Sequence, residues 1–427
     1  MVDLSTLPEE ARQAVERLGS VDIVVGIPSD EDGGRIETVA RAVSAGLAER
    51  CGQYRSAIIH ADGGLAGGSR KRLPALSLED TPLIRVPYEL SLVHRLSAPY
   101  HGMPGRDVAF RVILTLAHAL NVKACVVVAP DVGSHSSGSV GRLLGPVLQD
   151  GYDFVAPRYH RHRFDGTIVT GIVYPFTRAL YGKRIRQPLG DDFGLSGRLV
   201  GDYLRQPVWD TDVARFALNL WITTRATCGG FRVCQAYLGA RAHAARDPAI
   251  DLSTMLSQIL DPLFTDMDRN NAVWQRIRGS EPVPTFGDPL DVDAAPVSAN
   301  LQRMRESFRL GYQTLDEVWS QILPPTTMLD LKRLSRASDR DLLFPDELWA
   351  RVLYDFALGH HLRVMAREHL LGALTPLYLG WVASFVTQTE SAGADEVDAQ
   401  VERLCQAFES EKRYLISRWR WPDRFNP

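Results

Sequence analysis

The sequence predicts an α/β fold in which helices cover both faces of a mainly parallel sheet, followed by a mostly helical C-terminal region. Short, continuously apolar runs such as Ala124–Val128 are typical of strands that are buried on both faces. In the first 250 residues these runs alternate with amphipathic helical stretches, which is the pattern of parallel strands joined by helical crossovers. From about Asp251 the pattern changes to helices alone.

Composition limits the class of protein. The chain has 427 residues, enough for two domains, with 45% hydrophobic and 23% charged residues, as in ordinary globular proteins. The net charge of -3 argues against a broad nucleic-acid-binding surface. No apolar run reaches the ~20 residues of a membrane span. The five cysteines are scattered and form no Cys-x-x-Cys pair. We therefore expect a reduced, cytoplasmic protein without a membrane span or a nucleic-acid partner.

The elements of the first domain follow in order. After a short amphipathic helix in residues 5–18, apolar runs predict strands and periodic stretches predict helices. The predicted strands are 21–27, 56–60, 83–87, 124–128, 152–157 and an edge strand at 231–238. The predicted helices are 36–50, 108–120, 140–150, 167–181 and 213–224. The stretch 182–194 contains three Gly, one Pro and two Asp and is predicted to be a tight loop.

The second half is predicted to be helical. One or two helices cover 253–278, and a linker with four prolines covers 281–300. Further helices are predicted at 301–322, 346–357, 362–371, 377–386 and 396–408. The tail at 413–421 holds Trp419 and Trp421 among arginines and either docks on the body of the protein or forms a homodimer contact. The predicted divisions are an N-terminal helix (1–20), an α/β ligand-binding domain (21–250), a helix and linker (251–300) and a helical domain (301–427).

Polar turns end three of the predicted strands. These turns are Pro28-Ser29, Asp62-Gly63 and Pro130-Asp131. The carboxyl ends of parallel strands lie at one edge of a sheet, where ligands bind in open α/β folds. The joint pattern favours a nucleotide site, although each turn alone could be a simple chain reversal. Neither Gly-x-Gly-x-x-Gly nor Gly-x-x-x-x-Gly-Lys-Ser/Thr occurs, which argues against a dinucleotide fingerprint and a phosphate-binding ATPase loop.

Basic residues gather in two loops. The stretch 158–165 is basic and aromatic, and 182–194 brings Lys183, Arg184 and Arg186 close in sequence to Asp191 and Asp192. This composition suits a pocket for an anionic or polyhydroxyl ligand. A solvated surface loop is the alternative for each stretch.

Six segments together resemble a known family. They are Ile27-Pro28-Ser29, Ala61-Asp62-Gly63-Gly64, Gly102-Met-Pro-Gly105-Arg106, Ala129-Pro-Asp131, Gln187-Pro-Leu-Gly190-Asp191-Asp192 and Gly239-Ala-Arg-Ala-His243. In their order and relative spacing they resemble the motifs of the GT-A nucleotide-sugar glycosyltransferases. The resemblance is strongest to the mannosylglycerate synthase and glucosyl-3-phosphoglycerate synthase type, which is family-2-like. It covers about residues 21–250, and the Gln-Pro-Leu-Gly and Ala-His segments are its most specific parts.

The resemblance implies a GT-A (Rossmann-like) fold and a hexosyltransferase. Such an enzyme would move a hexose from a UDP- or GDP-sugar to a small, glycerate-like acceptor, with retention of the anomeric configuration. It implies that Asp131 and His243 bind Mn²⁺ or Mg²⁺, since carboxylate oxygen and imidazole nitrogen suit these ions. The arginines at 158, 161, 163, 184 and 186 favour an anionic acceptor.

Other residue roles carry over by position. Asp192, Asp191 and Arg186 would serve catalysis on the acceptor side. The nucleotide sugar would contact Pro28, Ser29, Asp62, Gly63, Gly105, Arg106, Lys183 and Gln187. Among these, Asp62 would accept from the base or ribose, and Arg106 and Lys183 would contact phosphates.

The chain also departs from the family pattern. Ala129 stands where the first Asp of Asp-x-Asp is expected, and Arg106-Asp107 replaces Lys-Gly. Asp191 replaces the second glycine of the acceptor loop. These departures motivate an alternative: a catalytically degenerate relative that binds a nucleotide or a partner, with the helical region as docking surface. A sugar-phosphate nucleotidyltransferase, which has a related fold, is a weaker alternative because its glycine-rich loop is missing after the first strand.

Overall fold

The computed structural model describes residues 7–29, 33–63, 81–89, 103, 105–130, 137–240, 252–289 and 300–422. The chain forms two compact units. The first contains residues 1–160, 187–242 and 283–294, and the second contains 161–186, 243–282 and 295–427. The domain boundaries drawn from the sequence at residues 20, 250 and 300 stay predictions.

The described part of the first unit is built on an eight-stranded sheet with the order β3-β2-β1-β4-β6-β5-β7-β8. Its neighbouring strands are parallel except at β6, which is antiparallel to both β4 and β5. The strands are β1 (Ile23–Ser29), β2 (Ser56–Asp62), β3 (Leu83–Pro87), β4 (Ala124–Val127), β5 (Phe154–His160), β6 (Phe193–Ser196), β7 (Val233–Ala240) and β8 (Thr285–Phe286).

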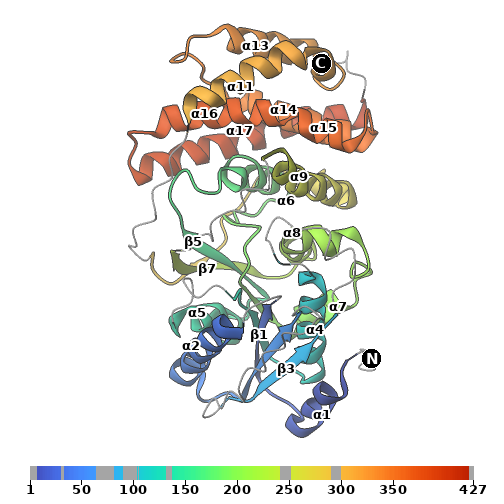
Figure 1. Ribbon diagram of the computed structural model, residues 1–427, viewed down its shortest axis with the longest axis vertical. Coiled ribbons are helices and arrows are strands. Elements are labelled where there is room, and N and C mark those ends of the chain that lie inside the picture. The colour runs from blue at the N-terminus through green and yellow to red at the C-terminus, as the bar shows by residue number, and fades with distance from the viewer. Residues whose placement is uncertain are drawn as a thin grey trace. The chain divides into compact units, whose positions relative to one another are not determined.

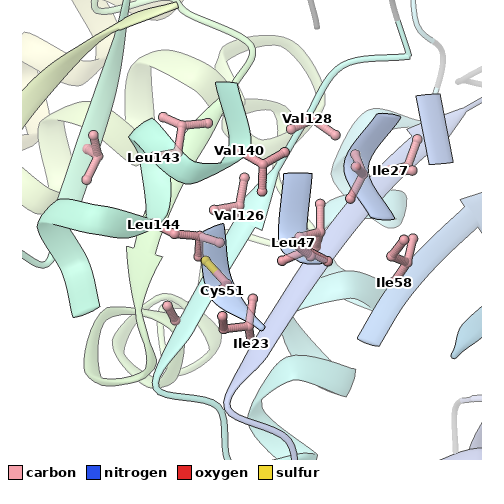
Figure 2. Packing of buried hydrophobic residues seen from close by; sticks show 14 of the residues in the cluster. Ile23, Ile27, Leu47, Cys51, Ile58, Val126, Val128, Val140, Leu143 and Leu144 are labelled. Atoms are coloured by element: carbon pink, nitrogen blue, oxygen red, sulfur yellow. The ribbon is translucent and has the colours of Figure 1, made fainter. Parts of the chain in front are cut away.

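Helices cover both faces of this sheet, as predicted (Figure 1). On one face α2 (Gly33–Cys51) and α5 (Ser137–Leu148) pack on alternate residues of the strands, with Ile23, Val25 and Ile27 of β1 in the same buried cluster (Figure 2). On the other face α4 (Arg106–Ala119) approaches β1 closely. A Cβ added at Gly26 would lie 2.3 Å from the Ile113 side chain, so glycine permits this contact. The remaining helices that the structure describes in this unit are α1 (Glu9–Leu18), α7 (Gly197–Leu204) and α8 (Asp212–Cys228).

Three sequence predictions in this unit are wrong in detail. The loop predicted at 182–194 ends in β6, a strand of four residues in which Gly194 lets the chain pass the Leu143 carbonyl. The strand predicted as an edge, β7, is paired on both sides, with β5 and β8. The segment predicted as a linker contains β8.

The second unit is helical, which confirms the prediction of a helical C-terminal region (Figure 1). A π-helical turn, Val169–Val173, leads into α6 (Tyr174–Tyr181). The other described helices are α9 (Leu252–Arg269), α10 (Asn271–Trp274), α11 (Leu301–Thr314), α12 (Asp316–Ser320), α13 (Pro325–Arg336), α14 (Asp346–Leu362), α15 (Arg367–Ala373), α16 (Thr375–Thr389) and α17 (Ala394–Arg420). Of these, α13 was not predicted.

Helix α17 joins this unit together. The fully buried guanidinium of Arg178 on α6 meets Glu402 at 2.6 Å and Glu409 at 2.7 Å, both on α17. The tail predicted as a separate segment is the last part of α17, and the ring of Trp419 stacks on His361 with centroids 4.0 Å apart. Trp419 therefore packs on the body of the protein, which is one of the two alternatives predicted for the tail. The other alternative, a homodimer contact, stays a prediction.

One stretch meets the length and composition of a membrane span, although no apolar run of that length was expected from the sequence. It is Arg367–Thr389, which covers α15 and α16. Of its most apolar window, 72% is buried inside the protein. A buried core helix passes the same test, so this stretch does not by itself indicate a span.

Candidate functional site

The candidate site lies along one edge of the sheet in the first unit. The carboxyl ends of β1 and β2 lie side by side there, with Ser29 opposite Asp62. Because β6 runs antiparallel to β4, its first residue, Phe193, pairs with Val127 near the end of β4. The loop that precedes β6 is thereby brought to the same edge as the turn that follows β4. The sequence predicted that the turns after parallel strands lie at this edge. The loop before the antiparallel strand β6 lies at the same edge.

Ser29 is the centre of the contacts at the end of β1. Its hydroxyl lies 2.7 Å from Nε2 of His60, and its carbonyl accepts hydrogen bonds from the Gly63 N–H (2.8 Å) and the Tyr88 hydroxyl (3.2 Å). A Cβ at Gly63 would lie 2.4 Å from the Tyr88 ring, so this close approach requires glycine. Pro28 pairs with Ala61 of β2. Pro28, Ser29 and Gly63 therefore lie together in one buried corner.

His60 is a buried residue of this corner that the sequence did not single out. Burial lowers its pKa to about 4; nearby Asp62 opposes this and Arg85 adds to it. The imidazole is therefore neutral at pH 7. Its Nδ1 is buried and has no hydrogen-bond partner within the part of the chain that the structure describes.

Asp62 is held by Arg85 of β3. The Arg85 Nε donates to Asp62 Oδ2 at 2.8 Å, and the Nη2 of the same guanidinium contacts the same oxygen. Asp62 was expected to accept from a base or a ribose. One of its oxygens already accepts from the protein, so any further contact would share the carboxylate with Arg85.

The acceptor loop, defined here as Gln187–Asp192, is held at its start by backbone partners. The Gln187 amide oxygen accepts from the Tyr159 N–H, and its nitrogen donates to the Tyr159 carbonyl, both at 3.0 Å. This pairing occurs where β5 changes register against β7. The Pro188 carbonyl accepts from Thr223 of α8 at 2.9 Å. The Gln-Pro part of the motif is therefore a structural anchor.

Gly190 in the middle of the loop packs directly on β5. A Cβ at this position would lie 2.1 Å from Pro157 Cγ. Such a distance does not occur between unbonded carbons, so any side chain here would push the loop away from the strand.

Asp192 joins the acceptor loop to β4 and β5. Its Oδ1 accepts a hydrogen bond of 2.7 Å from the Ala129 N–H, and its Oδ2 accepts from the Tyr159 hydroxyl. The residue is 1% exposed and its neighbour Asp191 is 7% exposed, so the alternative of a charged surface turn is wrong for both. The turn that begins at Ala129 and the acceptor loop are thus in direct contact.

Asp191 pairs with Arg106, the first residue of α4. The Arg106 Nη1 lies 2.9 Å from Asp191 Oδ1, and its Nη2 donates to the Asp191 carbonyl at 3.0 Å. Asn219 of α8 donates to the same carboxylate at 2.8 Å. Gly105 precedes the helix with φ of 70°, a left-handed conformation that favours glycine. Two residues that were predicted to contact ligand therefore contact each other.

The basic residues expected to bind an anionic ligand also have protein partners. In the second unit, Lys183 pairs with Glu281, Arg186 lies 3.0 Å from Asp398, and Arg163 donates to the Thr389 carbonyl at 3.1 Å. In the first unit the Arg158 guanidinium lies over the Tyr237 ring, 4.8 Å from its centre.

The two predicted metal ligands, Asp131 and His243, lie outside the described residues. Among the residues that the structure does describe, no three His, Cys, Asp or Glu side chains come together as a metal site.

Several site residues escaped the sequence analysis, although some carried a signal. His60 and Asp62 are two apart in a strand and so share a face. Asn219 is a lone amide inside the apolar helix predicted at 213–224, where an unpaired polar side chain would be unfavourable. Arg85 carried no such signal, because its partner is set by strand order, and Tyr159 lies in the basic and aromatic stretch 158–165, which did not indicate its contact with Asp192.

Comparisons with known proteins gave structural matches only. No family model matches the sequence, and no curated protein matches it. Among solved structures, the chain is similar to glucosyl-3-phosphoglycerate synthase from Mycobacterium tuberculosis. In complex with Mg²⁺ and UDP, that protein matches with 19% identity over 61% of this chain and 83% of the other, with a TM-score of 0.39.

Two further structures of the same protein match in the same way. In complex with Mn²⁺, UDP and phosphoglyceric acid, it matches with 19% identity over 61% of this chain and 82% of the other, at a TM-score of 0.38. In complex with Mn²⁺, UDP-glucose and phosphoglyceric acid, the values are 20%, 61%, 83% and 0.36. That protein is of the type that the sequence motifs resemble.

Proposed function

We propose that this chain is a GT-A-type glycosyltransferase that moves a hexose from a nucleoside-diphosphate sugar to a small, glycerate-like acceptor. The observation that carries the proposal is the double contact of Asp192. This buried carboxylate binds the Ala129 N–H at the start of the predicted metal-binding turn and the Tyr159 hydroxyl beside the acceptor loop. Donor-side and acceptor-side segments of the resemblance thus meet at the sheet edge where α/β folds bind ligands.

The reaction sets a clear electrostatic demand. Negative charge grows on the diphosphate as the glycosidic bond breaks, and a bound Mn²⁺ or Mg²⁺ would offset it. Asp131 and His243 would hold this ion through a carboxylate oxygen and an imidazole nitrogen. Ala129 supplies no carboxylate, so the protein offers fewer negative ligands than an Asp-x-Asp motif would.

The described residues would orient the substrates. Asp192, which accepts from the Ala129 N–H and the Tyr159 hydroxyl, would orient a sugar or acceptor hydroxyl at this edge of the sheet. Ser29, Gly63 and Asp62 would line the base and ribose at the ends of β1 and β2. Transfer would proceed with retention of the anomeric configuration, and the location would be the cytoplasm.

Calorimetric titration of UDP and GDP, with and without Mn²⁺, tests the proposal first. Binding of one nucleotide that requires the metal and weakens in His243→Ala would support it and identify the base. Sugar-nucleotide donors of that base would then be screened with glycerate and phosphoglycerate. If several donors at saturating concentration with Mn²⁺ gave neither transfer nor slow hydrolysis, the proposal would be refuted.

A degenerate, nucleotide- or partner-binding relative is the second candidate. It is favoured by Ala129, which leaves the predicted metal turn one carboxylate short, and by Asp107, which is buried in the first turn of α4. A carboxylate in a first helical turn interacts favourably with the helix dipole, where a phosphate would otherwise gain the same interaction. Activity that appears only after Ala129→Asp and Asp107→Gly are combined would support this candidate.

A further inference from the structure

We propose that Arg106, Asp191 and Asn219 form a buried positioning cluster that holds the acceptor loop in place, and that Arg106 is not a phosphate-binding residue. None of the three needs to touch a substrate for this role. The part of the inference that concerns catalysis rests on the proposed function, whereas the part that concerns the loop does not.

The geometry is that of a two-point contact. One guanidinium nitrogen of Arg106 meets the Asp191 carboxylate at 2.9 Å while another donates to the carbonyl of the same residue at 3.0 Å. A planar guanidinium that binds a side chain and its own backbone together fixes both the position and the rotation of that residue. Asn219 binds the carboxylate at 2.8 Å and the Leu189 carbonyl at 3.4 Å.

Burial makes the loss of either member of the pair costly. The side chains of Arg106 and Asp191 are 10% and 9% exposed. The Arg106 Nε is buried and has no hydrogen-bond partner among the described residues. Within that part of the chain, the positive charge of the guanidinium is therefore balanced mainly by the Asp191 carboxylate, with a smaller contribution from the Phe110 ring, whose centre lies 5.3 Å away. Removing one partner of a buried pair leaves an uncompensated charge, whereas removing both does not.

The cluster also explains two departures from the family pattern at once. Arg106 stands where the family has lysine, and Asp191 where it has glycine. The aspartate adds a negative charge to a buried place, and the planar guanidinium of Arg106 pairs with its carboxylate while it also binds the carbonyl of the same residue, a geometry that a lysine ammonium does not offer. Because Asp191 precedes Asp192 in the chain, fixing its carbonyl and side chain fixes the point from which the Asp192 carboxylate reaches Ala129 and Tyr159.

A double-mutant cycle on thermal unfolding tests the pair without any ligand. We expect Asp191→Asn and Arg106→Met each to lower the melting temperature by on the order of 10 °C. The double variant should be no worse than the more damaging single variant. The surface pair Arg111–Asp210 is the control, because Arg111 lies on the same helix and the two side chains are 51% and 89% exposed. Its cycle, Arg111→Met with Asp210→Asn, should show shifts of about 2 °C or less and no coupling.

Hydrogen exchange of the peptide that spans residues 187–196 measures positioning directly. Exchange should speed up in Asp191→Asn and remain unchanged in Asp210→Asn. If a single variant fails to fold while the double variant folds, the coupling is confirmed in its strongest form. If no Arg106→Met variant folds, Arg106→Lys, which keeps the charge and loses the second contact, replaces it in the cycle. Additive melting shifts, or unchanged exchange of this peptide, would overturn the inference.

Nucleotide affinity separates positioning from phosphate binding. In the positioning role, Arg106→Met and Asp191→Asn leave the Kd for UDP within about twofold and lower kcat by tenfold or more. A phosphate-binding Arg106 would instead weaken UDP binding at least tenfold in Arg106→Met alone, and that result would refute this part of the inference. A wild-type protein that neither binds nor transfers would refute the proposed function, while the melting and exchange experiments would still decide the cluster.

Discussion

Removing the Asp192 carboxylate is the most direct perturbation of the candidate site. In Asp192→Ala, the Ala129 N–H and the Tyr159 hydroxyl each lose a hydrogen bond to this carboxylate. Asp192 is 1% exposed, Ala129 4% and Tyr159 5%, so water does not readily replace the carboxylate. The variant therefore removes two buried hydrogen bonds at the point where the acceptor loop meets β4 and β5.

The magnitude follows from these two hydrogen bonds. A hydrogen bond to a charged group contributes about 1.5–3 kcal/mol, so losing both should lower the free energy of unfolding by about 3–6 kcal/mol. Tyr159→Phe removes one donor and should have roughly half this effect. Because both variants break the same contact, the double variant should be less destabilised than the sum of the two.

Urea unfolding of the purified protein, followed by tryptophan fluorescence and circular dichroism, gives these free energies. Asp210→Ala is the matched control, because Asp210 is an exposed aspartate whose surface ion pair with Arg111 should contribute less than about 1 kcal/mol. If Asp192→Ala were no more destabilising than Asp210→Ala, or if its effect simply added to that of Tyr159→Phe, the bridging role of Asp192 would be refuted.

Three further predictions concern single positions. Folding lowers the pKa of His60 from 6.5 to about 4, so between these pH values the unfolded chain binds a proton that the folded chain does not. The free energy of unfolding should therefore drop by ~3 kcal/mol as the pH falls from 6.5 to 4. In His60→Gln, urea unfolding at a series of pH values should show a smaller drop over this range. Gly190→Ala should destabilise the protein by about 1–3 kcal/mol and reduce transfer, since its Cβ meets Pro157, whereas Gly145→Ala on α5, with nothing within 4 Å, should be neutral or stabilising in the same urea assay. Arg178→Met should lower the free energy of unfolding by about 3–5 kcal/mol, because Glu402 and Glu409 lose their buried partner. If urea unfolding showed no larger effect for Arg178→Met than for Arg111→Met, which changes an exposed arginine, this prediction would be wrong.

Much of the fold could be predicted because the buried strands carry short, continuously apolar runs. Ile23–Ile27 and Ala124–Val128 identify themselves by composition, and the helices between them by their period. Strand β6 carries no such signal: it has four residues, one of them Gly194, and it follows a loop rich in Gly and Asp. Its identity as a strand comes from pairing with β4 and β5, a tertiary effect that a local pattern does not contain.

The candidate site divides in the same way. Gly63, Gly105 and Gln187 were identified by motif, and the structure shows a structural reason for each: close packing on Tyr88, a left-handed backbone, and pairing with Tyr159. The charged residues of the site, in contrast, have partners that are remote in sequence. Arg85 reaches Asp62, Arg106 reaches Asp191, and Asn219 reaches both the carboxylate and the backbone of the acceptor loop. A motif alone suggests that each charged residue is available to a ligand. A buried charge, however, needs a partner within the protein, as Asp62 has in Arg85 and Asp191 has in Arg106.

Ala129 shows how this changes the interpretation of a missing carboxylate. What Asp192 needs from position 129 is a backbone N–H, which any residue except proline provides, and the alanine side chain is 4% exposed. An aspartate at this position would place a second negative charge in a buried region close to Asp192, where like charges disfavour each other's ionised forms. Ala129→Asp would therefore not simply restore a family motif, because the buried bridge of Asp192 and the alanine at 129 fit each other. For this reason, the metal dependence of nucleotide binding in the wild-type protein is the test of whether Asp131 and His243 alone hold an ion. The stability of Ala129→Asp has to be measured before its activity is interpreted.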